Sequence, residues 1–303
     1  MSKLASIRDA VSEHVPDGSS VVMGTCLESM IPFAAGHELI RQERRDLTLI
    51  GPISDILFDQ LIGAGCVAMI RAAWVGNVSA GLGHAYRRAA EAGRPRPIDI
   101  EDHSNLSIAL GLHAAALGVP FLPTRSLLGS DIAAGSLAFA DLRDPWSRDR
   151  LLAVRAIQPD VAIVSVQRSD EDGNAHAWGN LGVTHEAVAA ADRVIVLAEE
   201  IVDGDVIRSD PNRVLVPGFR VSAVVHAPGA CHPSPVQGHY RRDHAFYAEY
   251  HEATRDEQGL AGWLREWVLD LPDRGAYLAR LGPRWDELRD LHEARAAAAD
   301  YAW

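Results

Sequence analysis

Several acidic residues and polar loops of this sequence stand directly after apolar segments of strand length. Glu101 closes the segment 98–101 and precedes a helix-like stretch. One polar loop occupies residues 125–131, and another begins at His232, after the segment 223–226. A carboxylate can act as a base or a nucleophile, while hydroxyls, backbone N–H groups and an arginine can bind an anion. Because ligands of open α/β sheets bind at the carboxyl ends of strands, this distribution favours chemistry at the edge of a sheet.

Each candidate also has a purely structural interpretation. Gly24 lies in a tight connection between a short strand and a helix, where the missing Cβ would also let the backbone approach a ligand. The loop after the strand-like residues 121–123 is either an ordinary connection or the lining of a ligand pocket, and prolines could fix the loop at His232 as a simple turn. Glu101 could be a carboxylate satisfied by the N-terminus of the following helix. The substrate-binding candidates are Gly24, Thr25, Arg125, Ser126, Gly129, Ser130, Asp131, His232, Ser234 and Gln237, and Glu101 is the catalytic candidate.

The partial matches to motifs of common cofactor and metal sites lack either the surrounding strands and helices or the ligand spacing that such sites require. Residues 63–68 match a degenerate GxGxxA pattern, but a helical pattern precedes them and a strand follows, which reverses the order of a dinucleotide fingerprint. The sequence has no GxSxG elbow and no P-loop. Four neighbouring histidines, His226, His232, His239 and His244, match no common ligand spacing. We therefore expect no metal and no tightly bound cofactor.

Strand-like and helix-like segments alternate along most of the chain. The expected strands are residues 21–23, 47–50, 67–72, 98–101, 161–166, 193–197, 214–216 and 223–226, and the expected helices include 32–43, 84–92 and 106–117. Asp55 is expected to cap a helix at 56–61, and Ser104 or Asn105 the helix at 106–117. Continuous apolar strands separated by helices predict an α/β fold, an open and mostly parallel sheet with helices on both faces. If the strand at 193–197 continues, Glu199 and Glu200 point to opposite faces, and we expect both to be structural.

The pattern changes after about residue 239. One apolar stripe runs along a helix through Leu260, Trp263, Leu264, Trp267, Val268 and Leu271, and a second helix is expected at 285–299. Such a stripe must be covered, because each large buried side chain contributes roughly 1.5–3 kcal/mol. We predict an α/β domain at residues 1–245 and a helical C-terminal extension at 246–303, packed on the same domain or on a neighbouring subunit.

Composition and charge narrow the class of protein. The formal net charge is −12 and no basic patch stands out, so we expect no nucleic-acid partner. No run approaches the ~18 apolar residues of a membrane span, and the charged, amphipathic start is no signal peptide, so we expect a cytoplasmic protein. The three cysteines are far apart and are expected to be reduced thiols.

Several blocks of the sequence, in order along the chain, resemble the class I CoA-transferase family, and within it the alpha subunits of the glutaconate CoA-transferase type. They are residues 17–32 with Asp17-Gly18, Gly24 and Pro32, residues 98–131 (IDIEDHSNLSIALGLHAAALGVPFLPTRSLLGSD), 198–202 (AEEIV), 210–213 (DPNR), 217–219 (PGF) and 232–240 (HPSPVQGHY). The resemblance implies an open α/β sheet and the role of an alpha subunit like that of glutaconate CoA-transferase. Its partner would be a homologous beta subunit, in a heterotetramer or a larger complex.

The resemblance also implies the reaction, in which coenzyme A moves between carboxylic acids by a ping-pong mechanism. A glutamate attacks the acyl-CoA, passes through an acyl anhydride and becomes a glutamyl-CoA thioester that the acceptor acid reopens. The family places this glutamate on the beta subunit, so this chain would supply the opposing wall of the pocket and its oxyanion donors. Coenzyme A and acyl-CoA are then substrates rather than bound cofactors.

Two alternatives to this hypothesis stay open. The chain could be the alpha subunit of a related two-subunit CoA-ester hydrolase that opens rings, with Glu101, at a position analogous to the partner's nucleophile, as base or nucleophile. It could also be a non-catalytic ligand-binding member of the fold. The resemblance suggests glutaconate-like dicarboxylates, and 3-oxo acids and larger ring-derived acids also remain open.

Overall fold

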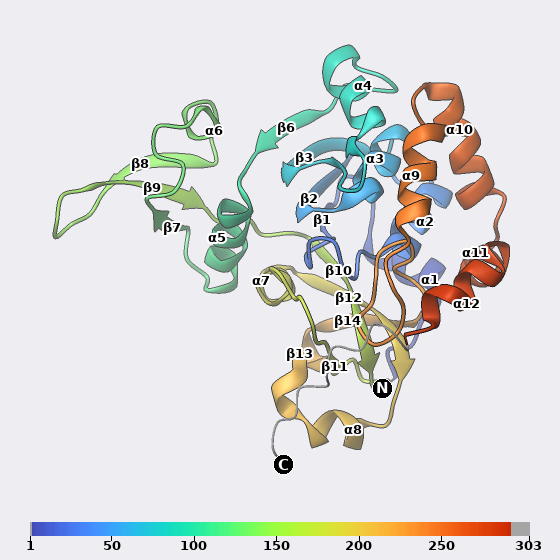
Figure 1. Ribbon diagram of the computed structural model, residues 1–303. Helices are drawn as coiled ribbons and strands as arrows, with labels where there is room; N and C mark the ends of the chain where they lie inside the picture. Colours follow the sequence, from blue (N-terminus) through green and yellow to red (C-terminus); the bar gives the residue numbers. More distant parts are fainter. Residues whose placement is uncertain (1, 292–303) are drawn as a thin grey trace.

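The structure is a computed structural model that describes residues 2–291. In this part of the chain a nine-stranded sheet forms the centre of the molecule (Figure 1). Its strands are β1 (Ser20–Val22), β2 (Leu47–Ile53), β3 (Val67–Trp74), β6 (Asp99–Asp102), β10 (Val161–Ser169), β11 (Ala175–His176), β12 (Arg193–Ile201), β13 (Val214–Val216) and β14 (Val221–His226). The parallel strands lie in the order β14-β12-β10-β1-β2-β3-β6, and β11 pairs antiparallel with β10 and β13. The predicted α/β fold with a mostly parallel sheet is confirmed.

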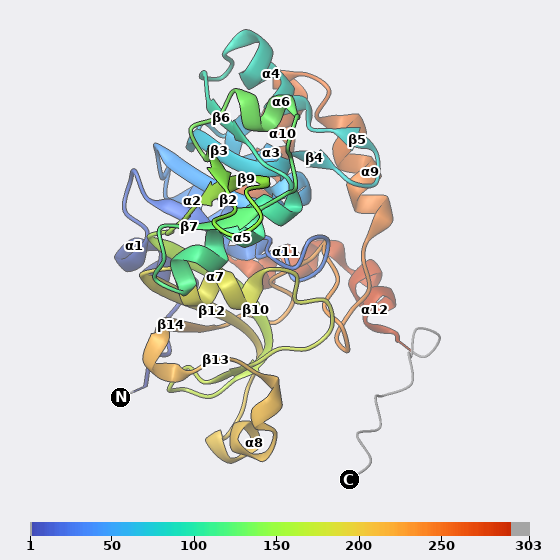
Figure 2. The ribbon, with the colours of Figure 1, turned by 90° about the vertical axis from the view of Figure 1, so that its left-hand side faces the viewer.

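Helices cover both faces of this sheet (Figures 1 and 2). The α-helices of the described residues are α1 (Ile7–His14), α2 (Phe33–Arg41), α3 (Asp55–Gly63), α4 (His84–Ala92), α5 (Asn105–Ala116), α6 (Asp131–Ala134), α7 (Thr184–Ala190), α8 (Gly204–Ser209), α9 (His244–Ala253), α10 (Glu257–Leu264), α11 (Arg274–Leu281) and α12 (Pro283–Arg289), and α6 lies outside these layers, beside β8 of the small sheet. One cluster of buried hydrophobic side chains packs the sheet against α1, α2, α3 and the C-terminal helices. A second such cluster packs the other face of the sheet against α5 and α7. Val21 and Val22 enter different clusters, because neighbouring strand residues point to opposite faces.

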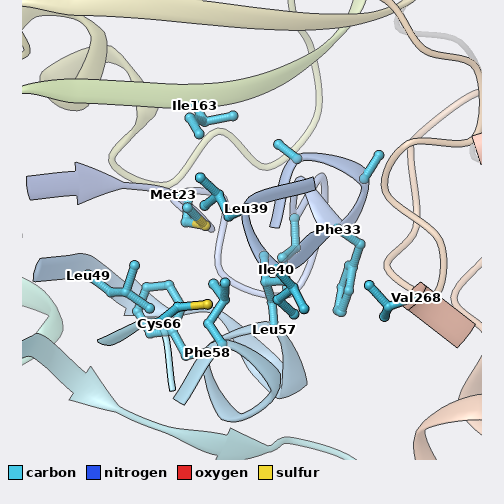
Figure 3. Packing of buried hydrophobic residues seen from close by; sticks show 14 of the residues in the cluster. Met23, Phe33, Leu39, Ile40, Leu49, Leu57, Phe58, Cys66, Ile163 and Val268 are labelled. Atoms are coloured by element: carbon cyan, nitrogen blue, oxygen red, sulfur yellow. The ribbon is translucent and has the colours of Figure 1, made fainter. Parts of the chain in front are cut away.

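The larger cluster fixes α2 and α3 against the sheet. Figure 3 shows Met23, Leu49 and Ile163 of the sheet region near Leu39 of α2 and Phe58 of α3. These five side chains are fully buried or nearly so. Because the strands are covered on both faces, they are continuous apolar runs, which is the pattern that revealed them in the sequence.

Of the two predicted helix starts, the one at Ser104 is confirmed and the one at Asp55 is wrong. Ser104 caps α5 as expected, since its side chain accepts a hydrogen bond from the Ser107 N–H. The prediction that Asp55 caps a helix is wrong: α3 begins at Asp55, and Ser54 holds the N-cap position. The buried Asp55 carboxylate instead accepts a hydrogen bond of 2.6 Å from Arg242. A distant arginine therefore determines the role of this carboxylate, which no local pattern signals.

A small antiparallel sheet projects from the main body beside β6 (Figure 1). It consists of β7 (Phe121–Thr124), β9 (Arg150–Arg155) and β8 (Phe139–Arg143), in that spatial order. The strand-like residues 121–123 therefore belong to this arm and not to the parallel sheet. A short two-stranded ribbon, β4 (Gly76–Asn77) with β5 (Gly81–Leu82), precedes α4.

The predicted apolar stripe lies on α10 and on the π-helical turn Arg265–Leu269 that continues it. Leu260, Trp263 and Val268 are buried in the same cluster as β1, β2 and β3. Of the helix expected at 285–299, the structure contains α12, which starts earlier, at Pro283, and ends at Arg289. Residues 290 and 291 are not helical, and the expected residues 292–299 lie outside the described residues. Among the helices of residues 2–291, none is long and apolar enough to cross a membrane.

Candidate active site

Glu101 lies on β6, the strand at one end of the parallel sheet, beside Arg71 of β3. The two residues are register partners, and so their side chains share a face. Arg71 Nε and His103 Nε2 each lie 3.0 Å from Glu101 Oε1. His103 is buried, and its Nδ1 lies 3.0 Å from the Ser107 Oγ of α5. The carboxylate is thus held between the neighbouring strand and the helix that follows β6.

The surroundings of Glu101 favour its charged form. The hydrogen bond with His103 and the positive charge of Arg71 hold the pKa of Glu101 below its ordinary value, although burial acts in the opposite direction. The side chain retains 17% of its exposure, so it is ionised and still accessible at neutral pH. Such a carboxylate can accept a proton or attack a carbonyl carbon.

Two clefts, which differ in volume and in the residues that line them, meet at Glu101. The smaller, of about 240 Å³, is lined by Arg71, Glu101, Ala138, Arg155, Ala156, Ile157 and Gln158. The larger, of about 390 Å³, is lined by Met69, Ile100, Glu101, Asp102, Asp131, Ile132, Gly135, Ser136 and Leu137. Glu101 is the residue that both share. A bound molecule could therefore contact this carboxylate from either side.

One residue of the predicted loop 125–131 reaches this region. Asp131, the first residue of α6, lines the larger cleft together with Glu101. Arg125 points elsewhere and pairs with Asp149 at 2.6 Å, while Ser130 caps α6. Ser126 and Gly129 line neither cleft. The inference from parallel-strand ends does not apply to this loop, because β7 belongs to the antiparallel arm.

Gly24 and Thr25 lie in the interior, where protein groups contact them. Gly24 has a φ of +67°, and a Cβ at this position would lie 2.2 Å from the Ser54 Oγ. Thr25 Oγ1 lies 2.7 Å from Thr184 Oγ1, at the start of α7. Both residues are buried. The close approach that Gly24 permits is thus an approach to the start of α3, and their contact with substrate stays a prediction.

The loop after β14 is likewise built into the core for most of its length. His232 is fully buried between Tyr277 Oη, at 2.8 Å, and Asp243 Oδ2, at 3.0 Å. Burial lowers the pKa of His232 to about 4, although the hydrogen bond with Asp243 acts in the opposite direction. Ser234 Oγ donates to the Glu28 carbonyl at 2.7 Å, whereas Gln237 is exposed. His232 and Ser234 therefore hold the loop in place.

A third cavity, larger than the two clefts beside Glu101, lies at the carboxyl ends of β12 and β14. It measures about 740 Å³ and is lined by Glu199, Glu200, Pro228, Gly229, Gly238, His239, Tyr240, Leu278, Trp285, Asp286, Arg289, Asp290 and Leu291. Glu199 accepts hydrogen bonds from the Tyr240 hydroxyl at 2.6 Å and the Gly229 N–H at 2.7 Å. Burial raises the pKa of Glu199, although both hydrogen bonds oppose this effect. Glu199 is buried and Glu200 exposed, as expected for neighbours on a strand that continues to Ile201.

Sequence reasoning missed the residues that surround Glu101. Arg71 and Arg155 are distant from Glu101 in the chain. Strand pairing brings Arg71 to Glu101, whereas Arg155 reaches the same cleft from β9 of the separate small sheet. His103 follows two residues after Glu101, and this spacing was the one signal available. Within residues 2–291, no group of three or more histidine, cysteine, aspartate or glutamate residues is arranged to hold a metal ion.

Comparison with known proteins adds a family match over most of the chain. A model described as coenzyme A transferase matches residues 4–227. The chain is 37% identical to the A subunit of 3-oxoadipate CoA-transferase of Pseudomonas knackmussii, over 93% of this chain and 99% of the relative. It is 32% identical to the A subunit of glutaconate CoA-transferase of Acidaminococcus fermentans, over 93% of this chain and 92% of the relative.

A solved structure and a hydrolase subunit are also similar to this chain. A crystal structure of glutaconate coenzyme A-transferase from Acidaminococcus fermentans superposes with a TM-score of 0.90, covering 95% of this chain and 96% of that one. The cholesterol ring-cleaving hydrolase IpdA subunit of Rhodococcus jostii is 28% identical, over 84% of this chain and 88% of the relative.

Proposed function

Since the chain belongs to the coenzyme A transferase family, we propose that it is the alpha subunit of a heteromeric enzyme that moves CoA between carboxylic acids. The observation that carries this proposal is its 37% identity, over nearly the whole of both chains, to one subunit of 3-oxoadipate CoA-transferase. Its partner is a beta subunit that holds the nucleophilic glutamate, in a heterotetramer or a larger complex. The acids are dicarboxylates, as in the names of the two CoA-transferase relatives.

The proposed reaction passes through a covalent intermediate on the partner. The glutamate of the beta subunit, through its carboxylate oxygen, attacks the thioester carbonyl, which forms a mixed anhydride and releases CoA as a thiolate. The thiolate then attacks the glutamyl carbonyl, which forms a glutamyl-CoA thioester and releases the donor acid. The acceptor carboxylate reverses these steps.

In this mechanism the alpha chain contributes the opposing wall of the pocket. Glu101, ionised and accessible at the junction of two clefts, is the group of this chain placed to contact the reacting atoms. Because it lies between Arg71 and His103, its charge is balanced locally and does not repel an approaching carboxylate as an isolated glutamate would.

The test is to locate the covalent intermediate. The chain is co-expressed with its beta partner, incubated with an acyl-CoA, treated with borohydride and digested for mass spectrometry. The proposal predicts a reduced glutamate on the partner, and the Glu101→Gln complex should still form it. A modified Glu101 with an unmodified partner would overturn the assignment of the nucleophile.

A second candidate function is CoA-ester hydrolysis, which the accessible Glu101 and the similarity to the IpdA subunit favour. In this reaction Glu101 would act as the base or the nucleophile, and no acceptor acid would be needed. The Glu101→Gln complex would then lose all turnover, and wild type would release free acid and CoA at the same rate with or without an added acceptor. Acceptor-dependent product formation excludes this alternative.

A further inference from the structure

The two clefts beside Glu101 carry opposite charge. The larger cleft adds the carboxylates of Asp102 and Asp131 to that of Glu101. The smaller cleft instead places two guanidinium groups, those of Arg71 and Arg155, around the same carboxylate. Formal charges therefore give the small cleft a net charge of about +1 and the larger one about −3. An anionic group that reaches Glu101 is accommodated in the small cleft and repelled from the larger one.

Arg155 gives the small cleft its net positive charge, because Arg71 and Glu101 balance each other. It lies at the end of β9, is exposed, and makes no side-chain hydrogen bond or ion pair with another residue of 2–291. Its charge nevertheless acts on Glu101, where it helps to lower the pKa of the carboxyl after the stronger effects of His103 and Arg71. Two other arginines of the arm differ, since Arg125 pairs with Asp149 and Arg150 with Asp141.

Arg71, the second arginine of the small cleft, is less exposed than Arg155 and, within the described residues, has N–H groups free to donate to a ligand. Its Nε is buried and lies 3.0 Å from Glu101 Oε1, yet the contact lacks hydrogen-bond geometry. A guanidinium carries five N–H donors in a planar fork that matches a carboxylate. Gln158, at the rim, is already engaged, because its amide donates to Asp192 at 2.9 Å.

We infer that Arg155, with Arg71 behind it, binds the free carboxylate of a dicarboxylic acyl group and so sets the preference of the enzyme for dicarboxylates. This inference rests on the proposed function, because it assigns the substrate end that is not activated by CoA. The volume of about 240 Å³ lies just below that of pockets for drug-sized ligands and suits a short acyl chain. The site needs no metal, since the carboxylate charge is met by guanidinium groups.

The test compares two acceptor acids of similar length, glutarate and butyrate, in the complex with the beta subunit. For Arg155→Gln, we expect kcat/KM for glutarate to fall about 10- to 100-fold relative to that for butyrate, which is the effect of losing a hydrogen bond between charged groups. Arg155→Lys should recover part of the loss, because lysine restores the charge without the planar fork. Arg150→Gln, on the same strand but outside the cleft, is the matched control and should leave the ratio unchanged.

The outcomes separate this inference from the function on which it rests. If wild type transfers CoA and Arg155→Gln leaves the glutarate-to-butyrate ratio unchanged, the inference is wrong while the function stands. If Arg155→Gln raises KM for every acyl-CoA donor equally and spares the acceptor ratio, the arginine binds a CoA phosphate, which also overturns it. If wild type transfers CoA to neither acid, the proposed function fails first.

Discussion

At the scale of single residues, the fold controls the charge of one carboxylate, Glu101. Arg71 and His103 both contact the same oxygen, Oε1, of a carboxylate that lines both clefts. The sequence indicated Glu101 because it closes an apolar segment, but it did not reveal Arg71 or Arg155. Neither has a sequence spacing to Glu101 that local periodicity could detect. Arg71 reaches Glu101 through the pairing of β3 with β6, and Arg155 through the placement of the separate small sheet beside β6.

The charge of Glu101 predicts a pH-dependent contribution to stability. Because its folded pKa lies below the ordinary value of 4.5, this contribution is present above about pH 4.5 and is lost as the pH falls through the lowered pKa. Glu101→Gln should therefore unfold more easily than wild type at pH 7, by on the order of 1 kcal/mol for a partly exposed charged group. Urea denaturation between pH 3 and pH 8 measures this, and the difference should shrink at the acid end.

Glu91→Gln is the control for that measurement. Glu91 pairs with Arg87 on the exposed surface of α4, where both side chains keep 62% of their exposure. We expect a change of less than about 0.5 kcal/mol there. If the Glu101→Gln difference were equally small at neutral pH, the ion pair with Arg71 would not be formed in solution.

Gly24 gives a second prediction at this scale. An alanine here meets both a left-handed backbone, at φ +67°, and the Ser54 side chain, whose Oγ would lie 2.2 Å away. Gly118 is the matched control, since its φ is +69° and a Cβ there meets nothing within 4 Å. Gly118→Ala should lower the free energy of unfolding by about 1–2 kcal/mol, because of the backbone conformation alone, and Gly24→Ala should lower it distinctly more. Equal losses in chemical denaturation would show that Ser54 moves away freely.

At the scale of elements, the sequence predicted the strands and helix caps whose local residue pattern matches the contacts that they make in the folded protein. The parallel strands were found because burial on both faces makes them continuous apolar runs. Strands β8 and β9 were missed. Most residues of β8 are exposed, and the apolar run 151–154 of β9 is too short to be told from a buried helix by its periodicity. The capping prediction succeeded at Ser104 and failed at Asp55, where the distant Arg242 captures the carboxylate.

Asp243 connects three C-terminal elements and provides the prediction at this scale. Its carboxylate caps α9 through the Phe246 N–H at 3.0 Å and also accepts from the buried His232 and from Arg284 of α12. Although burial raises it, hydrogen bonds from His232 and Arg284 hold the pKa of Asp243 at about 2. Asp243→Ala should destabilise the protein by roughly 3–5 kcal/mol, because it leaves buried partners unpaired.

Asp256→Ala tests whether this loss exceeds that of an ordinary cap. Asp256 caps α10 at an exposed site through the Gly259 N–H alone, at 2.8 Å. Its removal should cost about 1 kcal/mol, the typical value for a helix N-cap. Thermal or urea unfolding measures the loss of stability in each variant. A comparable loss in both would contradict the account of Asp243 as a buried connection between elements.

At the scale of the whole molecule, the described chain is an α/β body with its candidate reacting group at one end of the sheet. The small sheet β7–β9 projects beside β6 (Figure 1). Glu101 and Arg155, at the end of β9, line the smaller cleft, and Glu101 and residues of the segment 131–137 line the larger one. The overall architecture followed from the order of apolar segments, whereas the small sheet that contributes Arg155 to the smaller cleft did not. The proposed function adds a second polypeptide that brings the nucleophile to this wall.

The most direct test of the account is to measure CoA transfer between carboxylic acids with this chain alone and then with its beta subunit. The account predicts no detectable exchange by the isolated chain, even when it is folded and monodisperse, and restoration of exchange when the partner is added. Exchange by the isolated chain at a rate comparable to that of the complex would contradict the claim that this polypeptide holds half of an active site.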